Sequence, residues 1–536
     1  MPAVDLPERL NAATVFVDSH LPAGRGDKAA ILCGDEGVTY RQLRDNVNRV
    51  GNALINLGVR MEERVAILMP DCPECAYAFF GAIKIGAVAI PMNTMLMPKD
   101  YQYLLNDSRA RVLVVHPSLL RKVTEIRARL KYLEHIVAAG GGAEAPLLMR
   151  DLMASASEEL DAADTRKDDT AFWLYSSGTT GFPKGAIHLH HDMIVEADLY
   201  ARRTIGLLES DVSFSVAKLF FAYGLGNGLY FPLRGGGTTV LLPDRPLPQT
   251  VFEVIDRYLP TVFYGVPTSY AALLHLAEKQ QRKSLGRVRM CVSAGEPLPK
   301  PLYEKWHDRF GLEILDGIGS TEILHIFISN RPGKVKPGST GQIVPGYEAR
   351  IVDDDGNQVP VGREGTLFIK GDSIANGYWN KHEQTKQTFQ GEWINTHDKF
   401  RVDEDGYYWY AGRTDDMIKV SGMAVWPADV ESILLRHPAV LEAGVVGTED
   451  EEGLIKPRAY VVLKDGQVGS PELVGELQAF VKTNAEPYKY PRSIVFIDDL
   501  PKTATGKIQR YKLRELAAAE SRQEPPPQQG RRPREG

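Results

Sequence analysis

The stretch Tyr175–Gly185, YSSGTTGFPKG, is the segment from which the fold class and the function of this chain are inferred. An apolar run, Phe172–Leu174, precedes it, and the stretch itself holds three glycines, four serine or threonine hydroxyls and one lysine. Glycine lets backbone N–H groups approach an anion, while hydroxyls and a lysine add donors and positive charge for phosphoryl oxygens. A flexible surface turn would not explain this concentration of donors after a strand. We therefore predict a phosphate-binding loop formed by Ser176, Ser177, Gly178, Thr179, Thr180 and Lys184.

The spacing within this loop differs from that of a P-loop NTPase. A Walker A motif requires the pattern G-x-x-x-x-G-K-[ST]. Here Lys184 lies three residues after Gly181 and is followed by Gly185. The sequence therefore argues against that class of nucleotide-binding protein.

The composition is that of an ordinary globular protein with more than one domain. The chain has 536 residues, of which 43% are hydrophobic and 25% charged, and its formal charge is −6. A domain usually has ~100–200 residues, and nucleic-acid binders are usually basic. No run approaches the roughly 18 apolar residues of a membrane helix, and the start MPAVDLPERLNAA lacks the pattern of a secretory signal. We expect a cytoplasmic protein with neither a nucleic-acid nor a membrane partner.

Two groups of residues resemble metal ligands superficially. Cys72 and Cys75 form a C-x-x-C, but they lie in an apolar run, so we interpret them as small buried residues of a helix, with zinc or redox use as the alternative. His188, His190 and His191 form an H-x-H-H between a strand and a helix. We favour a structural role beside the phosphate loop over metal binding for these histidines.

The first 140 residues alternate between helical and strand patterns. Thr39 and Gln42 form a capping box before a helix, and apolar runs such as Val65–Met69 and Val112–His116 are typical of strands. A largely parallel sheet with crossover helices is the most economical interpretation.

Hairpin patterns replace this alternation after about residue 335. Arg350–Val352 and Val359–Val361 flank DDDGNQ, and Val402 and Tyr407–Tyr410 flank DEDG. We predict a large N-terminal α/β domain, with mixed sheets, crossover helices and a β subdomain, and a small mobile α+β C-terminal domain. The predicted boundaries are 1–412 for the large domain, 413–416 for a hinge, 417–520 for the small lid domain and 521–536 for a disordered tail poor in apolar residues.

Five further motifs follow the phosphate loop in order. They are SAGEPLP (Ser293–Pro299), DGIGSTE (Asp316–Glu322), WINTHDKF (Trp393–Phe400), GRTDDMIKVSGMAVWPADVE (Gly412–Glu431) and PKTATGKIQR (Pro501–Arg510). With the loop, they resemble the motifs of the adenylate-forming superfamily, which contains acyl-CoA ligases, adenylation domains and luciferases. The resemblance covers nearly the whole chain. It implies that an acid attacks the α-phosphate of ATP to form an acyl-adenylate and pyrophosphate, and that a thiol then displaces AMP.

The resemblance also assigns roles at the nucleotide site. It implies that Thr179, Thr180 and Lys184 hold the β- and γ-phosphates, that Thr321 contacts the α-phosphate and that Glu322 binds Mg²⁺. Fixed donors and cations suit this chemistry because both steps develop negative charge on oxygen. The remaining implied ATP contacts are Gly295, Glu296 and Pro297 at the adenine, Asp316 and Gly317 in the nucleotide motif, and Asp398 with Arg413 at the ribose.

The C-terminal motifs imply a catalytic lysine and a moving domain. Lys507 would bridge the carboxylate and the α-phosphate, which otherwise repel one another. Asp415 matches the hinge about which the small domain rotates between the two half-reactions. Rotation would withdraw Lys507 and bring in a CoA-binding face with Lys419, Ser421 and Gly422. A lysine acetyltransferase and a deacetylase acting on Lys507 would switch its charge off and on.

The segments Lys218–Leu233 and Asp316–Asn330 look most like the benzoate-CoA ligase branch. Many family members carry a proline–x–aromatic–histidine pattern where this chain has Lys218 and Phe221, so a histidine gate is not implied. If His325 faces the ring of the acid, it would favour hydroxy- or amino-benzoate by hydrogen-bonding a substituent. The resemblance places the acyl pocket at Ala222, Tyr223, Ala294, Gly319, His325 and Ile326.

The sequence thus predicts ligation of benzoate or a related aromatic acid to coenzyme A, with ATP, Mg²⁺ and CoA as cofactors. The alternatives within enzymes are a hydroxy-/amino-benzoate ligase, a medium-chain aliphatic acyl-CoA ligase and an adenylation enzyme that loads a carrier protein. Since the sequence shows no carrier domain, free CoA is the simpler acceptor. The alternative from another class of protein is a nucleotide-binding regulator without catalytic activity. A homodimer is a possible oligomeric state. AMP release that depends on both benzoate and CoA would separate an enzyme from a binding module.

Overall fold

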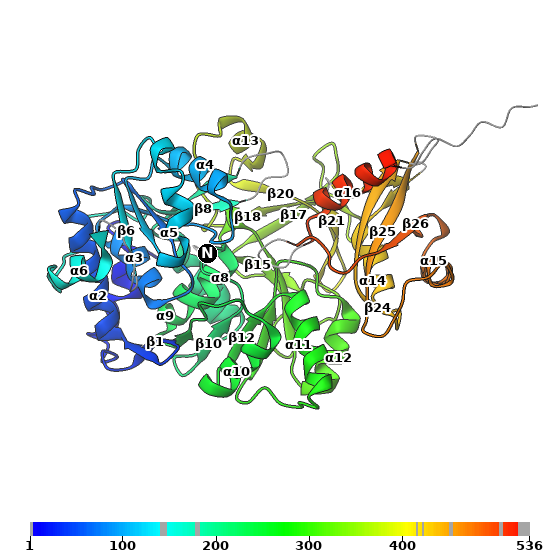
Figure 1. Cartoon of the computed structure of the whole chain (residues 1–536), viewed down its shortest axis with the longest axis horizontal. Helices are drawn as coiled ribbons and strands as arrows, with labels where there is room; N and C mark the ends of the chain where they lie inside the picture. The colour runs from blue at the N-terminus through cyan, green and yellow to red at the C-terminus, as the bar shows by residue number, and fades with distance from the viewer. Residues whose placement is uncertain are drawn as a thin grey trace, which may run out of the picture. The chain divides into compact units, whose positions relative to one another are not determined.

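A computed structural model describes residues 4–139, 147–176, 183–413, 416–420, 423–449, 454–502 and 508–523 (Figure 1). Its contacts divide the chain into two compact units. The first comprises Met1–Thr396 and Phe400–Tyr410, and the second comprises His397–Lys399 and Ala411–Gly536.

A seven-stranded sheet occupies the N-terminal part of the first unit. Its neighbouring strands run parallel except for the last pair, β8 and β9, which is antiparallel. The predicted crossover arrangement is therefore confirmed for this region. In spatial order the strands are β7 (Leu147–Leu148), β6 (His135–Ala138), β5 (Val112–Val115), β3 (Arg64–Leu68), β4 (Val88–Pro91), β8 (Thr170–Ser176) and β9 (Lys184–Leu189).

A nine-stranded mixed sheet forms the other large layer of this unit. Its central strands are parallel, and antiparallel pairs lie at both ends. In spatial order they are β16 (Gln342–Ile343), β15 (Ile326–Ser329), β14 (Ile314–Gly319), β13 (Met290–Ser293), β12 (Val262–Gly265), β10 (Val212–Ser215), β11 (Thr238–Val240), β1 (Ala29–Cys33) and β2 (Glu36–Thr39).

Helices between the strands begin at local sequence signals. Thr39 and Gln42 form the predicted capping box at the start of α2, with N–H···O distances of 2.9 and 3.2 Å. Cys72 and Cys75 are buried at the start of α3, where burial raises the pKa of both thiols. The helices of this unit are α1 (Ala12–Phe16), α2 (Tyr40–Asn56), α3 (Pro73–Lys84), α4 (Pro98–Ser108), α5 (Pro117–Thr124), α6 (Met149–Ala154), α7 (Asp192–Glu196), α8 (Ala222–Leu225), α9 (Phe231–Gly235), α10 (Pro248–Tyr258), α11 (Pro267–Lys279), α12 (Lys300–Phe310) and α13 (His382–Thr388).

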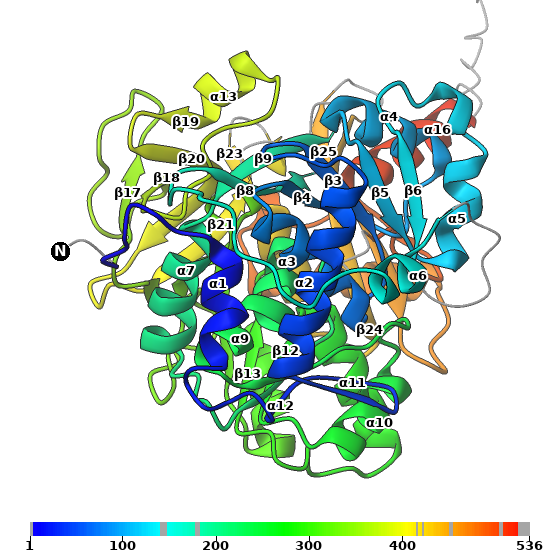
Figure 2. The same cartoon turned by 90° about the vertical axis from the view of Figure 1, so that its left-hand side faces the viewer.

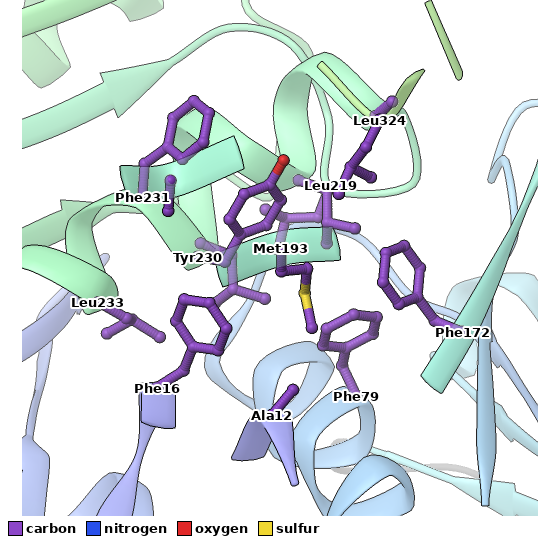
Figure 3. Close-up of a cluster of buried hydrophobic side chains, with 14 of the residues drawn as sticks. Ala12, Phe16, Phe79, Phe172, Met193, Leu219, Tyr230, Phe231, Leu233 and Leu324 are labelled. Atoms are coloured by element: carbon purple, nitrogen blue, oxygen red, sulfur yellow. The ribbon is translucent and has the colours of Figure 1, made fainter. Parts of the chain in front are cut away.

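One hydrophobic core connects the two large sheets. Figure 2 shows α2 and α3 side by side, and Figure 3 shows aromatic side chains from α1, α3, β8 and the segment around α9 converging. The rings of Phe16 and Tyr230 lie 6.1 Å apart, and those of Phe79 and Phe172 lie 5.6 Å apart. Each such buried ring contributes roughly 1.5–3 kcal/mol by leaving water. The core therefore fixes the base of the phosphate hairpin, because Phe172 belongs to β8.

A third, antiparallel sheet follows in the chain. The predicted hairpin at DEDG is confirmed, since β20 and β21 pair around it and Gly406 adopts a φ of 79°. The predicted turn at DDDGNQ also forms, with Asp353 N–H donating to Asn357 O and Val359 N–H donating to Ile351 O, both at 2.9 Å, and an isolated bridge between Val352 and Gln358. The strand expected at Val359–Val361 after this turn is wrong, and β17 pairs along its length with β18. Pro360 has no N–H to donate to a ladder. The strands are β17 (Glu348–Val352), β18 (Gly365–Lys370), β19 (Phe389–Gln390), β20 (Trp393–Val402) and β21 (Tyr408–Arg413).

The second unit is a small α+β structure with a core of its own. Val445, Val461 and Leu477 are fully buried between its three-stranded sheet and its helices. Its elements are the hairpin β22 (Ile418–Val420) and β23 (Met423–Val425), the sheet strands β24 (Val440–Glu449), β25 (Ile455–Leu463) and β26 (Ser493–Phe496), and the helices α14 (Pro427–Leu434), α15 (Pro471–Asn484) and α16 (Arg510–Gln523). The predicted α/β plus α+β architecture is confirmed. Among the described residues of the whole chain, no helix is long and apolar enough to span a bilayer.

Candidate active site

The structure describes part of the predicted site. The backbone of Lys419 lies in β22, whereas its side chain is not described. The predicted residues outside the described part of the chain are Ser177, Gly178, Thr179, Thr180, Asp415, Ser421, Gly422 and Lys507.

The predicted phosphate loop is the connection of a β hairpin. Ser176 at the end of β8 stands opposite Lys184 at the start of β9 in the antiparallel register. The outer edge of β9 pairs in turn with the segment Gly377–Trp379: Ile187 N–H donates to Gly377 O at 3.0 Å, and Trp379 N–H donates to Gly185 O at 2.9 Å. Both ends of the loop are therefore held by backbone hydrogen bonds.

The carboxylate of Glu322 accepts hydrogen bonds from two hydroxyl groups in distant segments of the chain. Ser176 Oγ donates to Glu322 Oε1 at 3.1 Å, and Tyr378 Oη donates to the same oxygen at 2.8 Å. Glu322 lies in a single 3₁₀ turn, Thr321–Ile323, directly after β14. The structure thus brings together the first residue of the loop and the predicted Mg²⁺ ligand.

Tyr378 is a site residue that the sequence analysis missed. The ammonium of Lys184 lies 4.6 Å from the centre of the Tyr378 ring, while the hydroxyl of Tyr378 holds Glu322. Its position in the run Gly377–Tyr378–Trp379 carries neither a phosphate-binding nor a metal-binding pattern. Its role becomes visible only through the pairing of this segment with β9.

The buried side chain of His188 contacts the turn Thr321–Ile323, which contains Glu322. Its Nδ1 lies 2.7 Å from Asp192 Oδ2, and its Nε2 lies 2.8 Å from the backbone oxygen of Thr321. Both His188 and Asp192 are fully buried. His190 accepts the N–H of Ala12 at 3.0 Å. Within the residues that the structure describes, no cluster of three His, Cys, Asp or Glu side chains is arranged for a metal ion.

Two of the predicted nucleotide motifs lie on neighbouring strands. Ser293 at the end of β13 pairs with Asp316 in β14, and Asp316 Oδ2 accepts the N–H of Leu298 at 3.4 Å. Burial raises the pKa of Asp316 well above its usual value. After β13 the chain turns at Gly295, whose φ of 96° favours glycine. The three predicted adenine contacts are exposed or half-buried in this turn: Gly295, Glu296 and Pro297.

The predicted acyl residues gather at the carboxyl ends of β12, β13 and β14. Tyr223 Oη lies 3.1 Å from the backbone oxygens of Gly265 and Val292, at the ends of β12 and β13. Gly319 pairs with Ile326 across β14 and β15. Ligands commonly bind at the carboxyl ends of parallel strands. Ala222, Ala294, His325 and Ile326 are buried, and Tyr223 and Gly319 are half-buried.

Gly319 permits a close approach of two backbones within this group. A Cβ atom at Gly319 would lie 2.3 Å from the backbone oxygen of His325. A backbone atom cannot move aside as the end of a flexible side chain can. Only glycine fits here, and Gly317 is nearly as restricted because a Cβ there would lie 2.9 Å from Ile328 O.

The predicted ribose pair belongs to the second unit. Arg413 Nη1 lies 3.8 Å from Asp398 Oδ1, and the Arg413 side chain is 40% exposed while that of Asp398 is 12% exposed. The partly accessible guanidinium and the carboxylate form an ion pair that offers both hydrogen-bond donors and hydrogen-bond acceptors.

Comparisons with known proteins define the family of this chain. The model of the AMP-binding enzyme family matches residues 19–379, and that of the AMP-binding enzyme C-terminal domain matches residues 429–507. The chain belongs to the AMP-binding enzyme family. Within it, the chain is an AMP-forming acid–thiol ligase of the benzoate–CoA ligase branch, for which ATP and coenzyme A are the implied co-substrates.

The relatives cover nearly the whole chain. A benzoate–CoA ligase of Thauera aromatica is 52% identical over 96% of this chain and 97% of its own length. A 4-hydroxybenzoate–CoA/benzoate–CoA ligase of Rhodopseudomonas palustris is 45% identical over 94% of each. The solved anthranilate CoA ligase AuaEII in complex with anthranoyl-AMP is 46% identical, with a TM-score of 0.94 over 97% of this chain and 100% of that one.

Proposed function

We propose that this protein joins benzoate or a closely related aromatic carboxylate to coenzyme A through an acyl-adenylate, with release of AMP and pyrophosphate. The observation that carries this proposal is the turn between β14 and β15. The carboxylate of Glu322 in this turn accepts a hydrogen bond from Ser176 of β8, and the backbone oxygen of Thr321 lies 2.8 Å from His188 Nε2 of β9. Gly319 and Ile326 at the two ends of the turn belong to the group of predicted acyl residues. One short segment therefore serves both the nucleotide and the acid.

Lys184 and Glu322 have the chemistry that ATP and Mg²⁺ require. Hard oxygen ligands suit Mg²⁺, which usually binds one or two carboxylates together with substrate phosphates. The Glu322 carboxylate fits because its Oε1 is already oriented by Ser176 and Tyr378. When bound, Mg²⁺ supplies positive charge to the phosphates. Lys184 supplies a second positive charge from the start of β9.

The remaining predicted residues complete the proposal. Thr321 holds the α-phosphate, Asp398 and Arg413 hold the ribose, and Lys507 brings the two anions together. Rotation about Asp415 would then present Lys419, Ser421 and Gly422 to CoA. The second candidate function is ligation of a hydroxy- or amino-benzoate, which the anthranilate CoA ligase neighbour favours.

The test is AMP release measured with a panel of benzoate, 4-hydroxybenzoate, 2-aminobenzoate, phenylacetate and hexanoate. We expect AMP release that requires both the acid and CoA, with the highest kcat/KM for a benzoate. A higher kcat/KM for hexanoate would contradict the aromatic assignment. Absence of AMP release with every acid, while ATP still binds, would support a regulatory nucleotide-binding protein instead.

A further inference from the structure

One face of α4 makes hydrogen bonds to the three chain segments that hold the predicted phosphate loop. Tyr103 Oη donates to the backbone oxygen of Pro183 at 3.1 Å, just before β9. Asp107 Oδ2 accepts the hydroxyl of Tyr175 in β8 at 2.8 Å, and Asp107 O accepts Trp379 Nε1 at 2.9 Å. Tyr103 and Asp107 lie four positions apart, so their side chains share one helix face. The helix therefore links β8, the start of β9 and the segment that pairs with β9.

The helix itself is fixed in the core of the seven-stranded sheet. Tyr101, Leu104 and Leu105 are at most 2% exposed and pack in one cluster with residues of β3, β4, β5 and β8. Tyr101 Oη also donates to Asn93 O at 2.8 Å. A helix with its apolar face packed in this way has little freedom to shift. It is a rigid support for the groups on its other face.

The hydrogen bond from Tyr103 acts on the peptide that leads into Lys184. The oxygen of Pro183 and the N–H of Lys184 belong to one planar peptide unit, so fixing the oxygen fixes the plane. Lys184 begins β9 opposite Ser176, and its ammonium lies 4.6 Å from the centre of the Tyr378 ring. The direction of the Lys184 side chain is thus set by the peptide plane at its base and by Tyr378 at its tip.

Both tyrosine hydroxyls keep their protons at neutral pH. Burial, reinforced by the charge of Asp107, raises the pKa of Tyr103 and that of Tyr175 above the ordinary value of a tyrosine. Each hydroxyl therefore has one hydrogen to donate. A carbonyl oxygen and a carboxylate only accept, so both hydrogen bonds run from the tyrosine to the acceptor.

We propose that Tyr103 and Asp107 are positioning residues for the phosphates of ATP, Tyr103 through the direction of Lys184 and Asp107 through Tyr175 at the base of the loop. The proposal rests on the proposed function, in which Lys184 holds the β- and γ-phosphates. Because one neutral hydrogen bond makes a modest net contribution, we expect loss of the Tyr103 hydroxyl to raise the dissociation constant for MgATP about fivefold. The predicted acyl residues lie on other segments, so KM for benzoate stays unchanged.

The first experiment compares two tyrosines of the same helix. Tyr103→Phe and Tyr101→Phe each remove one hydroxyl that donates to a backbone oxygen, that of Pro183 in one case and that of Asn93 in the other. Calorimetry measures the dissociation constant for MgATP, and pyrophosphate exchange measures KM for benzoate. We expect about fivefold weaker ATP binding in Tyr103→Phe, wild-type ATP binding in Tyr101→Phe and an unchanged KM for benzoate in both. Equal ATP binding by the two variants would overturn the proposal.

A double-mutant cycle tests whether Tyr103 acts through Lys184. In Lys184→Ala the side chain that Tyr103 directs is absent. Adding Tyr103→Phe to Lys184→Ala should therefore weaken ATP binding by less than about twofold, since residues that act as a unit are not additive. A further loss as large as in the single variant would show that the two residues act independently, and would overturn the proposal.

Two variants of Asp107 test its hydrogen bond to Tyr175. Asp107→Asn keeps an oxygen that accepts the hydroxyl, whereas Asp107→Ala removes it. The backbone oxygen that accepts Trp379 Nε1 remains in both variants. We expect near wild-type ATP binding in Asp107→Asn and weaker binding in Asp107→Ala. Wild-type binding in Asp107→Ala, or equal losses in both variants, would overturn the role proposed for this residue.

The outcomes distinguish this inference from the proposed function. A wild-type enzyme that releases AMP with benzoate and CoA, but whose ATP affinity is unchanged by Tyr103→Phe, overturns the inference alone. A wild-type protein that binds no ATP overturns the proposed function, and the inference with it.

Discussion

Tyr378 contacts two residues of the predicted nucleotide site with different parts of one side chain. Its hydroxyl holds the carboxylate of Glu322, and its ring lies under the ammonium of Lys184. The donor-rich glycine loop predicted Lys184 as a phosphate ligand, and the family resemblance predicted Glu322 as a Mg²⁺ ligand. They did not identify Tyr378, whose partner Glu322 is 56 positions away in the chain. A single tyrosine acquires such a role only through tertiary contact.

Replacement of Tyr378 separates these two contacts. Tyr378→Phe keeps the ring beneath Lys184 but removes the hydroxyl, and we expect about a tenfold loss of adenylate formation because a hydrogen bond to a charged group is worth roughly 1.5–3 kcal/mol. Tyr378→Leu removes both contacts and is expected to lose more. Pyrophosphate exchange as a function of Mg²⁺ concentration measures the effect. Equal rates for the wild type and Tyr378→Phe would show that the hydroxyl does not orient Glu322.

Lys507 is predicted to act in only one half-reaction. We expect Lys507→Ala to reduce adenylate formation by about 10²–10³-fold, as when one charge-stabilising donor is removed, while thioester formation from synthetic benzoyl-AMP is largely retained. Lys502→Ala is the matched control, because Lys502 already pairs with Glu442 and Asp499 in the same unit. An equal loss in both half-reactions would contradict the predicted domain alternation.

At the scale of elements, local sequence signals predicted the structure correctly where a few neighbouring residues determine a helix cap or a turn. The capping box at Thr39 and the glycine-containing hairpin at DEDG form as predicted. The strand expected at Val359–Val361 does not form. Pro360 lies between the two valines and has no N–H to donate to a neighbouring strand. The order of strands across the sheets is set by long-range packing, and the sequence patterns alone did not define it.

The turn between β14 and β15 gives a prediction at this scale. Gly319→Ala would place Cβ 2.3 Å from the backbone of His325, so we expect β14 and β15 to separate locally, with a lower melting temperature and loss of acid-dependent AMP release. Gly235→Ala is the control, because no atom lies within 4 Å of its Cβ position. Thermal unfolding and AMP release measure both variants. A fully active and stable Gly319→Ala enzyme would contradict the close approach.

At the scale of the whole molecule, the helix, strand and hairpin patterns of the sequence predicted a large N-terminal α/β domain with a β subdomain and a small C-terminal α+β domain. They could not predict the long-range partners of individual buried groups. Glu196, for instance, meets Tyr347 and His325 from segments more than 120 positions away. The sequence gives no sign that this glutamate is uncharged. Such buried acids make the stability of the molecule depend on pH.

The titration of Glu196 should make the free energy of unfolding of the protein depend on pH. Its pKa is raised from 4.5 to about 8 by burial, so the stability that comes from its neutral form is present below pH ~4.5 and is lost as the pH rises towards 8. Glu196→Gln cannot titrate. We expect the variant to gain on the wild type between pH 5 and 8, by at most about 1.4 kcal/mol per pH unit. Urea unfolding at several pH values tests this, and a constant difference would contradict it.

The pairing of Gly377–Trp379 along β9 has a consequence for the behaviour of the protein in concentrated solution. An uncovered terminal strand of a sheet offers a row of free amide and carbonyl groups that can recruit another chain. Here that row is occupied by the protein's own backbone, through the contacts at Gly185 and Ile187. The hairpin of the predicted phosphate loop is thereby also shielded from edge-to-edge aggregation.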